Sequence, residues 1–275
     1  MPVIRGIRLN NAPEIDVLIP AIEKDLATLP FVIDHLRRYV QHPIGRIYIV
    51  SPPSSKIRNL CSNKNCTFVD EKTVLPITKK DINYQSARWD RSGWLYQQLL
   101  KMNGDHIVNA KHFLVIDADT ILIRPHSFVK EGKTIFYCRD WSQPEYFNTY
   151  RKLLGMKPPR PRSFVTHYML LEKTKLAALR KKIEAIHQLT WYKAIIRSID
   201  KKKQFGFSEY ETYANYLYTT NPDRMILRSS KNKGLNMDAS SLKEEEIVNL
   251  ARQYRSLSFH KRKIYSKAPR AKVRK

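Results

Sequence analysis

Cysteine and long apolar runs are both scarce in this chain. It contains three cysteines in 275 residues, Cys61, Cys66 and Cys138, an odd number that builds no disulfide framework and favours a reducing compartment. No second cysteine pair or nearby histidine accompanies Cys61 and Cys66, so we expect no structural zinc site. No apolar run approaches the roughly 18 residues of a membrane span, and no signal-like apolar stretch opens the chain. We therefore expect a cytoplasmic protein.

Acidic residues are also few. The chain has 25 Asp and Glu against 50 Lys and Arg, a formal net charge of +25. A charge of this size attracts anions, so we expect an anionic substrate or partner. The composition of 42% hydrophobic and 11% aromatic residues excludes a wholly disordered chain.

The charge is uneven along the sequence. No acidic residue follows Glu246, whereas residues 252–275 hold ten basic ones. We expect one catalytic domain over residues 1–262 and an exposed basic tail over residues 263–275. Such a tail fits peripheral association with the anionic inner face of a membrane.

Apolar patterns predict an alternation of strands and helices. A buried strand over 15–20, an amphipathic helix over 29–40 and a strand over 46–51 form a β-α-β unit, which implies a parallel sheet. Further strands are expected over 66–69, 112–116, 121–123, 134–138 and 164–171, and further helices over 90–102, 145–154, 173–187, 190–203, 208–218 and 240–254. Ligands of such sheets bind outside the carboxyl ends of the strands.

The strongest strand, His112–Ile116, runs directly into Asp117-Ala118-Asp119. Because side chains alternate along a strand, we expect Asp117 and Asp119 to project from the same face at the end of this apolar run. Two carboxylates beside an apolar strand need a compensating cation, and oxygen ligands at this spacing suit Mg²⁺ or Mn²⁺. The alternative is a solvated turn at the end of the strand.

Four ordered segments carry a family resemblance. They are the β-α-β opening, R-W-D-R-S-G-W-L-Y-Q-Q-L-L-K over 88–101, F-L-V-I-D-A-D-T over 113–120 and F-S-E-Y-E-T-Y over 207–213. Together they resemble nucleotide-sugar glycosyltransferases of the GT-A fold, and more narrowly a group of bacterial glycosyltransferase-like proteins with unassigned acceptors. The resemblance runs from Ile15 to His260. It implies a Rossmann-like α/β fold with a mixed, mainly parallel central sheet flanked by helices.

The resemblance also implies a metal site. Asp117 and Asp119 match the D-x-D that holds Mn²⁺ or Mg²⁺ against the donor diphosphate, with Asp119 the direct ligand and Asp117 nearer the ribose or the metal-bound waters. His260 stands where many such enzymes place a further ligand, and Lys261 is in a position to face a phosphate. For His260 alone, a role in the core or on the surface is the alternative.

Donor binding is expected at two further places. The nucleoside-binding loop of such enzymes is matched only at Pro20 and Ala21. Arg88 and Arg91 precede a helix whose N-terminus itself favours phosphate. Ordinary surface charge, or an ion pair with Asp90, is the alternative for both arginines.

An inverting transfer needs a carboxylate base within hydrogen-bond reach of the acceptor hydroxyl. Glu209 and Glu211 are the candidates, and their spacing lets only one enter the cleft. We prefer Glu209, which matches the acidic residue that opens this helix in inverting relatives. Ser208 would then be the N-cap and Glu211 its capping-box partner. In a retaining enzyme Glu209 would only bind acceptor hydroxyls.

His167 and Trp141 are the candidates for acceptor binding. His167 alternates with the apolar residues of an expected strand, and Trp141 offers a stacking surface for a sugar. A structural histidine and a buried aromatic are the respective alternatives.

The sequence thus predicts a metal-dependent glycosyltransferase that moves a sugar from a nucleotide-sugar donor. The acceptor is unknown, with an anionic polymer or a lipid-linked glycan as classes that fit the charge. The alternative is a basic nucleic-acid-binding protein or metal-dependent nuclease. It ranks second because no groove-reading motif or aromatic RNA platform stands out.

Overall fold

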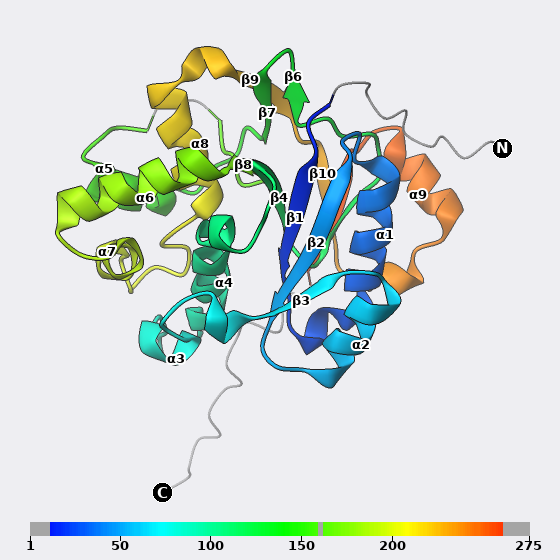
Figure 1. Cartoon of the computed structure of the whole chain (residues 1–275), viewed down its shortest axis with the longest axis horizontal. Coiled ribbons are helices and arrows are strands. Elements are labelled where there is room, and N and C mark those ends of the chain that lie inside the picture. The colour runs from blue at the N-terminus through cyan, green and yellow to red at the C-terminus, as the bar shows by residue number, and fades with distance from the viewer. Residues whose placement is uncertain (1–11, 159–161, 261–275) are drawn as a thin grey trace, which may run out of the picture.

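The computed structural model describes residues 12–158 and 162–260, and its centre is a five-stranded sheet (Figure 1). The strand order is β3-β2-β1-β4-β8. Strand β1 pairs in parallel with β2 and β4, β2 pairs in parallel with β3, and only β8 is antiparallel. The strands are β1 (Ile15–Pro20), β2 (Ile44–Ser51), β3 (Thr67–Asp70), β4 (His112–Ile116) and β8 (Tyr168–Glu172). The mixed, mainly parallel sheet is as predicted.

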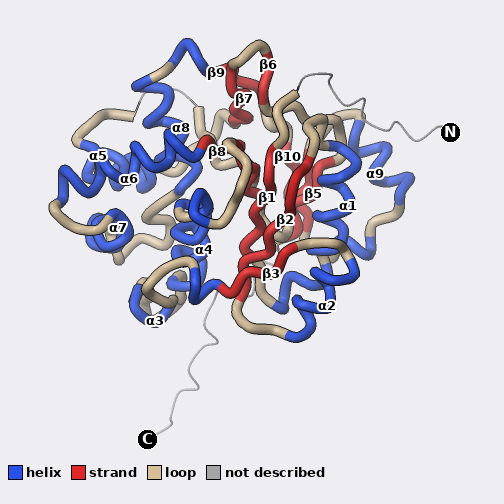
Figure 2. Tube along the Cα trace, in the orientation of Figure 1, coloured by secondary structure: helices blue, strands red, loops and turns tan. Residues whose placement is uncertain are grey.

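Helices cover both faces of this sheet (Figure 2). On one side lie α1 (Leu29–Tyr39), α2 (Ser55–Asn63) and α9 (Glu244–Ala251). On the other lie α3 (Lys79–Ile82), α4 (Ser92–Met102), α5 (Pro144–Leu154), α6 (Lys173–His187), α7 (Trp191–Ser198) and α8 (Glu209–Thr220). No helix of the described residues is long and apolar enough to cross a bilayer.

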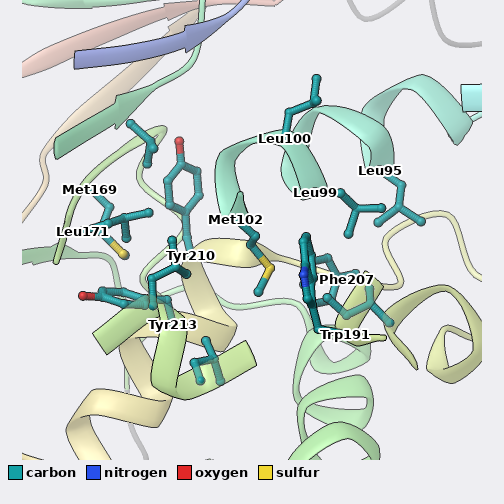
Figure 3. Close-up of a cluster of buried hydrophobic side chains, with 14 of the residues drawn as sticks. Leu95, Leu99, Leu100, Met102, Met169, Leu171, Trp191, Phe207, Tyr210 and Tyr213 are labelled. Carbon is teal, nitrogen blue, oxygen red and sulfur yellow. The ribbon is translucent and has the colours of Figure 1, made fainter. Parts of the chain in front are cut away.

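The alternation of side chains along the central strands explains the two layers. In β4, Phe113 and Val115 join a buried cluster with α4 and α8, whereas Leu114 and Ile116 join a second cluster with α1. Figure 3 shows part of the first cluster, which brings together side chains of α4, β8 and α8. Because both faces of β4 are covered, its sequence is a continuous apolar run after His112.

One buried carboxylate inside the sheet is structural. Asp16, in β1, is 2% exposed. Its oxygens accept hydrogen bonds from the backbone N–H groups of Arg46 (2.8 Å), Asn109 (2.7 Å) and Ala110 (2.9 Å). These bonds satisfy the charge within the fold, so Asp16 ties β1 to two neighbouring segments.

Two smaller sheets extend the core. The first has the order β10-β11-β5, with β10 (Asn232–Leu235), β11 (Ser256–Phe259) and β5 (Thr120–Leu122). The second has the order β6-β7-β9, with β6 (Val129–Lys130), β7 (Lys133–Cys138) and β9 (Met225–Ser229). Antiparallel pairing of β11 with β5 brings the end of the described chain beside residues 117–120.

Several element boundaries differ from the sequence expectation. The strand expected over 164–171 begins at Tyr168, the helix expected over 190–203 ends at Ser198, and the helix expected over 240–254 is confined to α9. Helix α2 and strands β9, β10 and β11 were not predicted, because each is short and carries a weak periodic signal. The proposed domain boundary at residue 262 and the basic tail lie outside the described residues.

Candidate active site

The D-x-D segment lies in a turn. Strand β4 ends at Ile116, and the Thr120 N–H donates to the Asp117 carbonyl oxygen (3.1 Å) to close the turn into β5. The expectation that both carboxylates project from one strand face is therefore wrong. The Asp117 N–H still bonds to the His167 carbonyl oxygen (2.9 Å), but the turn sends the two carboxylates to different partners.

Asp117 belongs to a group of four side chains, Lys101, Asp117, Glu209 and Tyr210, which we call the inner group. Lys101 Nζ contacts Asp117 Oδ1 and donates to Glu209 Oε1 (2.8 Å) and to the Tyr210 hydroxyl (3.1 Å). The Tyr210 hydroxyl donates in turn to Asp117 Oδ1 (3.1 Å). The side chains of Lys101 and Glu209 are each 6% exposed. One buried cation thus serves two carboxylates.

The inner group shifts the pKa values of its members. Burial disfavours the charge on Lys101, but Asp117 and Glu209 outweigh it and hold the lysine pKa well above its usual value. Burial likewise opposes the charge of Asp117, yet Lys101 and the His167 hydrogen bond lower the pKa of this carboxyl. Burial dominates at Glu209 and Tyr210 and raises both pKa values. Asp117 is therefore the ionised partner, and Glu209 is held closer to protonation.

Helix α8 delivers Glu209 and Tyr210 through its first turn. Ser208 is the N-cap, as predicted, and its Oγ accepts from the Glu211 N–H (3.2 Å). Gln98 of α4 supports the same turn, because its Oε1 accepts from the Glu209 N–H (3.1 Å). The start of α8 is thereby fixed against α4, which carries Lys101.

Asp119 and His260 form what we call the outer pair. His260 Nδ1 lies 3.2 Å from Asp119 Oδ2, across 141 residues of sequence. The Phe259 N–H, at the end of β11, donates to the Asp119 carbonyl oxygen (2.8 Å) and sets this approach. The side chains of Asp119 and His260 are 28% and 29% exposed. The Asp117 side chain is equally exposed at 28%, whereas Lys101 and Glu209 of the inner group are buried.

His167 connects the inner group and the outer pair. Its Nδ1 lies 3.0 Å from Asp117 Oδ2, and its ring centroid lies 5.1 Å from that of His260. The His167 backbone has a positive φ of 70°, a left-handed conformation that costs a non-glycine residue on the order of 1 kcal/mol or more. Strand β8 therefore begins after His167, at Tyr168 instead of the predicted residue 164, and the His167 side chain turns to Asp117.

The outer pair has the spacing of two ligands on one cation. Adjacent ligands of an octahedral ion with bonds of about 2.1 Å lie about 3 Å apart, close to the distance between Asp119 Oδ2 and His260 Nδ1. Over 12–158 and 162–260, no three His, Cys, Asp or Glu side chains group tightly enough to hold an ion by themselves. Mg²⁺ and Mn²⁺ commonly keep water and substrate phosphate oxygens as ligands, so two protein ligands are chemically sufficient for such an ion. The residues present therefore fit the predicted metal.

Asp25 is a third carboxylate near the turn that the sequence did not reveal. It lies in a short 3₁₀ helix, Glu23–Ala27, just beyond β1. Its Oδ2 accepts from the Ile22 N–H (2.9 Å). Burial, with a contribution from the charges of Asp119 and Asp117, raises the pKa of Asp25 to about 6. In the sequence, Asp25 has only the spacing of an acidic residue in the first turn of a helix, three positions after the N-cap residue Ile22.

Lys101 is the other residue that sequence reasoning missed. It stands in the apolar run L-L-K-M at the end of α4, between residues that are almost wholly buried. A single lysine at a buried helical position needs an acidic partner. That signal was available in the sequence, but it does not say which carboxylate is the partner.

Of the two predicted acidic candidates, only Glu209 is linked to Asp117, because both carboxylates contact the Lys101 ammonium group. Glu211 is wholly buried, and its carboxylate contacts the Ser163 hydroxyl and accepts from the Phe164 N–H (3.2 Å) and from Asn215 Nδ2 (3.1 Å). The predicted capping box is wrong for this reason, since the Glu211 side chain turns inward instead of back to the N-cap. Burial raises the Glu211 pKa.

The predicted donor residues lie at different depths. Pro20 and Ala21 are buried at the end of β1, where the Ala21 N–H bonds to the Val50 carbonyl oxygen (2.9 Å). Arg91 is 5% exposed, and its guanidinium lies 4.4 Å from the centre of the Trp94 ring. Arg88 is exposed in the loop before α4.

The last two predicted residues are Trp141 and Lys261. Trp141 is 62% exposed, so the expected alternative of a buried ring does not hold, and the Arg139 guanidinium lies 4.7 Å from its ring centre. Lys261 lies outside the described residues. Its role and that of Trp141 stay predictions.

A sequence profile described as a family of unknown function, DUF6492, matches residues 13–267. The chain belongs to this family. No curated protein sequence matches it significantly. Membership in DUF6492 therefore covers nearly the whole length but brings no activity with it.

Solved structures give the fold of this DUF6492 member. The bifunctional glycosyltransferase WbbM aligns with a TM-score of 0.52 at 11% identity, over 93% of this chain and 47% of that one. Mouse xyloside xylosyltransferase 1 (14% identity, 89% and 97% covered) and the galactosyltransferase LgtC with donor and acceptor sugar analogues (12%, 89% and 87%) each align with a TM-score of 0.48. The fold is GT-A-like, as the resemblance implied.

Proposed function

We propose that this protein is a glycosyltransferase that moves a sugar from a nucleotide-sugar donor to an acceptor hydroxyl with the help of Mn²⁺ or Mg²⁺. The outer pair carries the proposal, because Asp119 and His260, 141 residues apart in the sequence, meet at a spacing that fits one ion. The pair lies where β4 ends, and parallel α/β sheets bind ligands outside the carboxyl ends of their strands. The GT-A-like fold supports a nucleotide-sugar donor.

In the proposed reaction the metal ion stabilises the leaving group, and side chains of the protein hold the ion in place. The sugar–phosphate bond breaks, and the departing nucleoside diphosphate gains negative charge, which a bound divalent ion stabilises as a Lewis acid. In the protein, Asp119 and His260 would hold the ion. Asp117 is already neutralised by Lys101, so we assign it to positioning or to the donor ribose instead of direct ligation.

Glu209 is our candidate for the base that accepts the proton of the acceptor hydroxyl in an inverting reaction. It is preferred to Glu211 because it belongs to the inner group, whereas Glu211 is wholly enclosed by its own hydrogen bonds. Its raised pKa moves it towards the pH at which a carboxylate is an effective base. Replacement by Gln should lower the turnover rate about 10²-fold or more and leave donor affinity almost unchanged.

Acceptor binding is proposed for His167, which faces the aspartates, and for exposed Trp141. The net charge of +25 favours an anionic acceptor, such as an anionic polymer or a lipid-linked glycan. Arg88 and Arg91 remain proposals for the donor phosphates.

A ligand panel tests the donor class. Thermal melts with UDP, GDP, CMP and their sugars, each with and without Mn²⁺, should show a metal-dependent rise in melting temperature for one nucleotide, because a ligand of the native state stabilises it. Titration calorimetry of Asp119→Ala should then show loss of metal-dependent binding. The matched control is Asp140→Ala, since Asp140 is 97% exposed. Unchanged metal-dependent binding in Asp119→Ala would overturn the assignment.

A further inference from the structure

A second concave surface lies between α3, α5, α7 and the segment that follows α7. This groove has a volume of about 770 Å³. None of the residues that line it belongs to the inner group or the outer pair. Its floor includes the apolar side chains of Ile77, Tyr192, Ile196 and Ile199.

The two sides of helix α7 differ in burial and in charge. Its buried side consists of Trp191, Ala194, Ile195 and Ser198. Towards the groove, Tyr192 and Ile196 are half-buried, while Lys193 and Arg197 are exposed. Apolar side chains one turn apart, with basic side chains next to them, are typical of helices that lie in the interface of a bilayer.

The groove also carries an excess of positive charge. Its lining contains five basic side chains, Lys152, Lys193, Arg197, Lys201 and Lys202, against two acidic ones. Both acidic side chains already accept local hydrogen bonds. Asp81 caps α3 by accepting from the Thr78 N–H (2.7 Å), and Asp200 accepts from the Lys202 N–H (3.0 Å). The surface is therefore complementary to an anion.

We propose that this groove docks the protein on the anionic phospholipid surface of a membrane. Lys and Arg near such a surface gain attraction from the headgroups, while the tyrosine and isoleucine side chains enter the boundary with the acyl chains. A nucleic acid would use the same charges, but the isoleucine floor offers no hydrogen bonds to bases and only one aromatic ring for stacking. The combination of apolar floor and basic rim favours the lipid surface.

The groove is connected to the candidate active site through the chain. Residues 199–202, at its edge, lead within a few positions to Ser208 and the start of α8. The hydroxyl of Tyr84 holds this connection, since it contacts the Lys203 carbonyl oxygen and accepts from the Gly206 N–H (2.8 Å). Docking at the groove therefore fixes the orientation of the segment that supplies Glu209.

Vesicle sedimentation of the full chain tests the proposal. The groove variant is Lys193→Gln/Arg197→Gln/Lys201→Gln. Its control, Lys130→Gln/Lys133→Gln/Arg224→Gln, makes the same charge change at three exposed positions around the β6–β7 hairpin. The vesicles contain phosphatidylcholine with about 30 mol% phosphatidylglycerol, or phosphatidylcholine alone, so that only the first carry the negative surface that attracts basic residues.

We expect the native chain to bind only the anionic vesicles, and salt to weaken this binding. Each basic residue near the surface contributes roughly fivefold, so the groove variant should lose about 100-fold in partitioning, and the control much less. Melting curves of both variants report folding, and because the replaced side chains are exposed, both should melt like the native chain.

Four results would each overturn the proposal. They are an absence of native binding, undiminished binding of the groove variant, an equal loss in both triple variants, and a groove-dependent affinity for single-stranded RNA without affinity for vesicles. The third result would assign the attraction to net charge alone. The fourth would assign the groove to a nucleic acid. The test needs no sugar transfer, so it stands or falls separately from the proposed enzyme activity.

Discussion

Asp117 and Asp119 are two residues apart but have different partners. Asp117 is held by buried Lys101, together with Tyr210 and His167. Asp119 faces His260. Both aspartate side chains are 28% exposed, so the two residues differ in their partners and not in their burial. The protein itself supplies a cation to Asp117, whereas we propose that Asp119 and His260 hold a bound ion.

The largest effect is expected from Lys101→Met, which tests whether Lys101 holds the inner group together. Without the lysine, buried Glu209 and partly exposed Asp117 lose the cation that lies between them, so the free energy of unfolding at pH 7 should fall by about 3 kcal/mol. The loss should shrink below about pH 5, where the carboxylates take up protons. Urea denaturation measures it.

The control for that experiment is Lys111→Met. Lys111 is 68% exposed and lies 3.6 Å from Glu172, so the same substitution should change stability by no more than about 1 kcal/mol. Equal stability of Lys101→Met and the native chain would show that the inner group is not held together by this lysine.

Asp25 offers a test of the charge around the turn. Its pKa is about 6 in the folded chain and about 3.9 when unfolded, so the native state binds more protons between these values and stability falls as pH rises through them. Asp25→Asn removes that fall. The variant should equal the native chain near pH 4 and exceed it by up to about 3 kcal/mol at pH 8.

Denaturation at a series of pH values measures this effect. Asp140→Asn, at a carboxylate that is 97% exposed, should give no comparable gain. A gain for Asp25→Asn that is as large at pH 4 as at pH 8 would contradict the electrostatic explanation and would point to better packing.

His260→Gln probes the outer pair. Loss of the imidazole should weaken Mn²⁺ binding in the presence of nucleoside diphosphate about tenfold or more, because one of two protein ligands is removed. Stability without metal should change by less than about 1 kcal/mol, since the side chain is partly exposed. Electron paramagnetic resonance of free Mn²⁺ reports the affinity. An unaltered affinity would remove His260 from the metal site.

The smallest effect is expected from Ser208→Ala. Loss of the N-cap hydrogen bond to the Glu211 N–H should cost about 1 kcal/mol. The metal affinity should not change, because the proposed ligands, Asp119 and His260, belong to other elements than α8. Ser54→Ala, at the N-cap of α2, is the matched control. A drop in Mn²⁺ affinity for Ser208→Ala alone would mean that the inner group and the outer pair are coupled.

Much of the fold could be predicted because its signals are local. The apolar run in β4, the periodicity of α1 and the serine before α8 each report on neighbours in sequence, and the structure has these elements. Strands β10 and β11 were missed because they are four residues long and partner distant segments. Pairing across the chain leaves almost no trace in a single sequence.

In the candidate site, too, local features could be predicted and long-range contacts could not. The spacing of Asp117 and Asp119 was visible, but the direction of each carboxylate is decided by a turn and by partners far along the chain. Lys101 was visible only as a lysine in an apolar run, and neither its partners nor the surroundings of Asp25 could be identified, because they come from other elements. His260 was anticipated from a family resemblance, and the pairing of β11 with β5 places it beside Asp119.

That last pairing has a consequence for biosynthesis. Strand β11 is the final strand of the described chain, and it alone carries His260 to Asp119. A nascent chain still attached to the ribosome near residue 250 would possess the central sheet and the inner group but only half of the outer pair. A chain that stops before β11 therefore keeps Asp119 but lacks its partner His260.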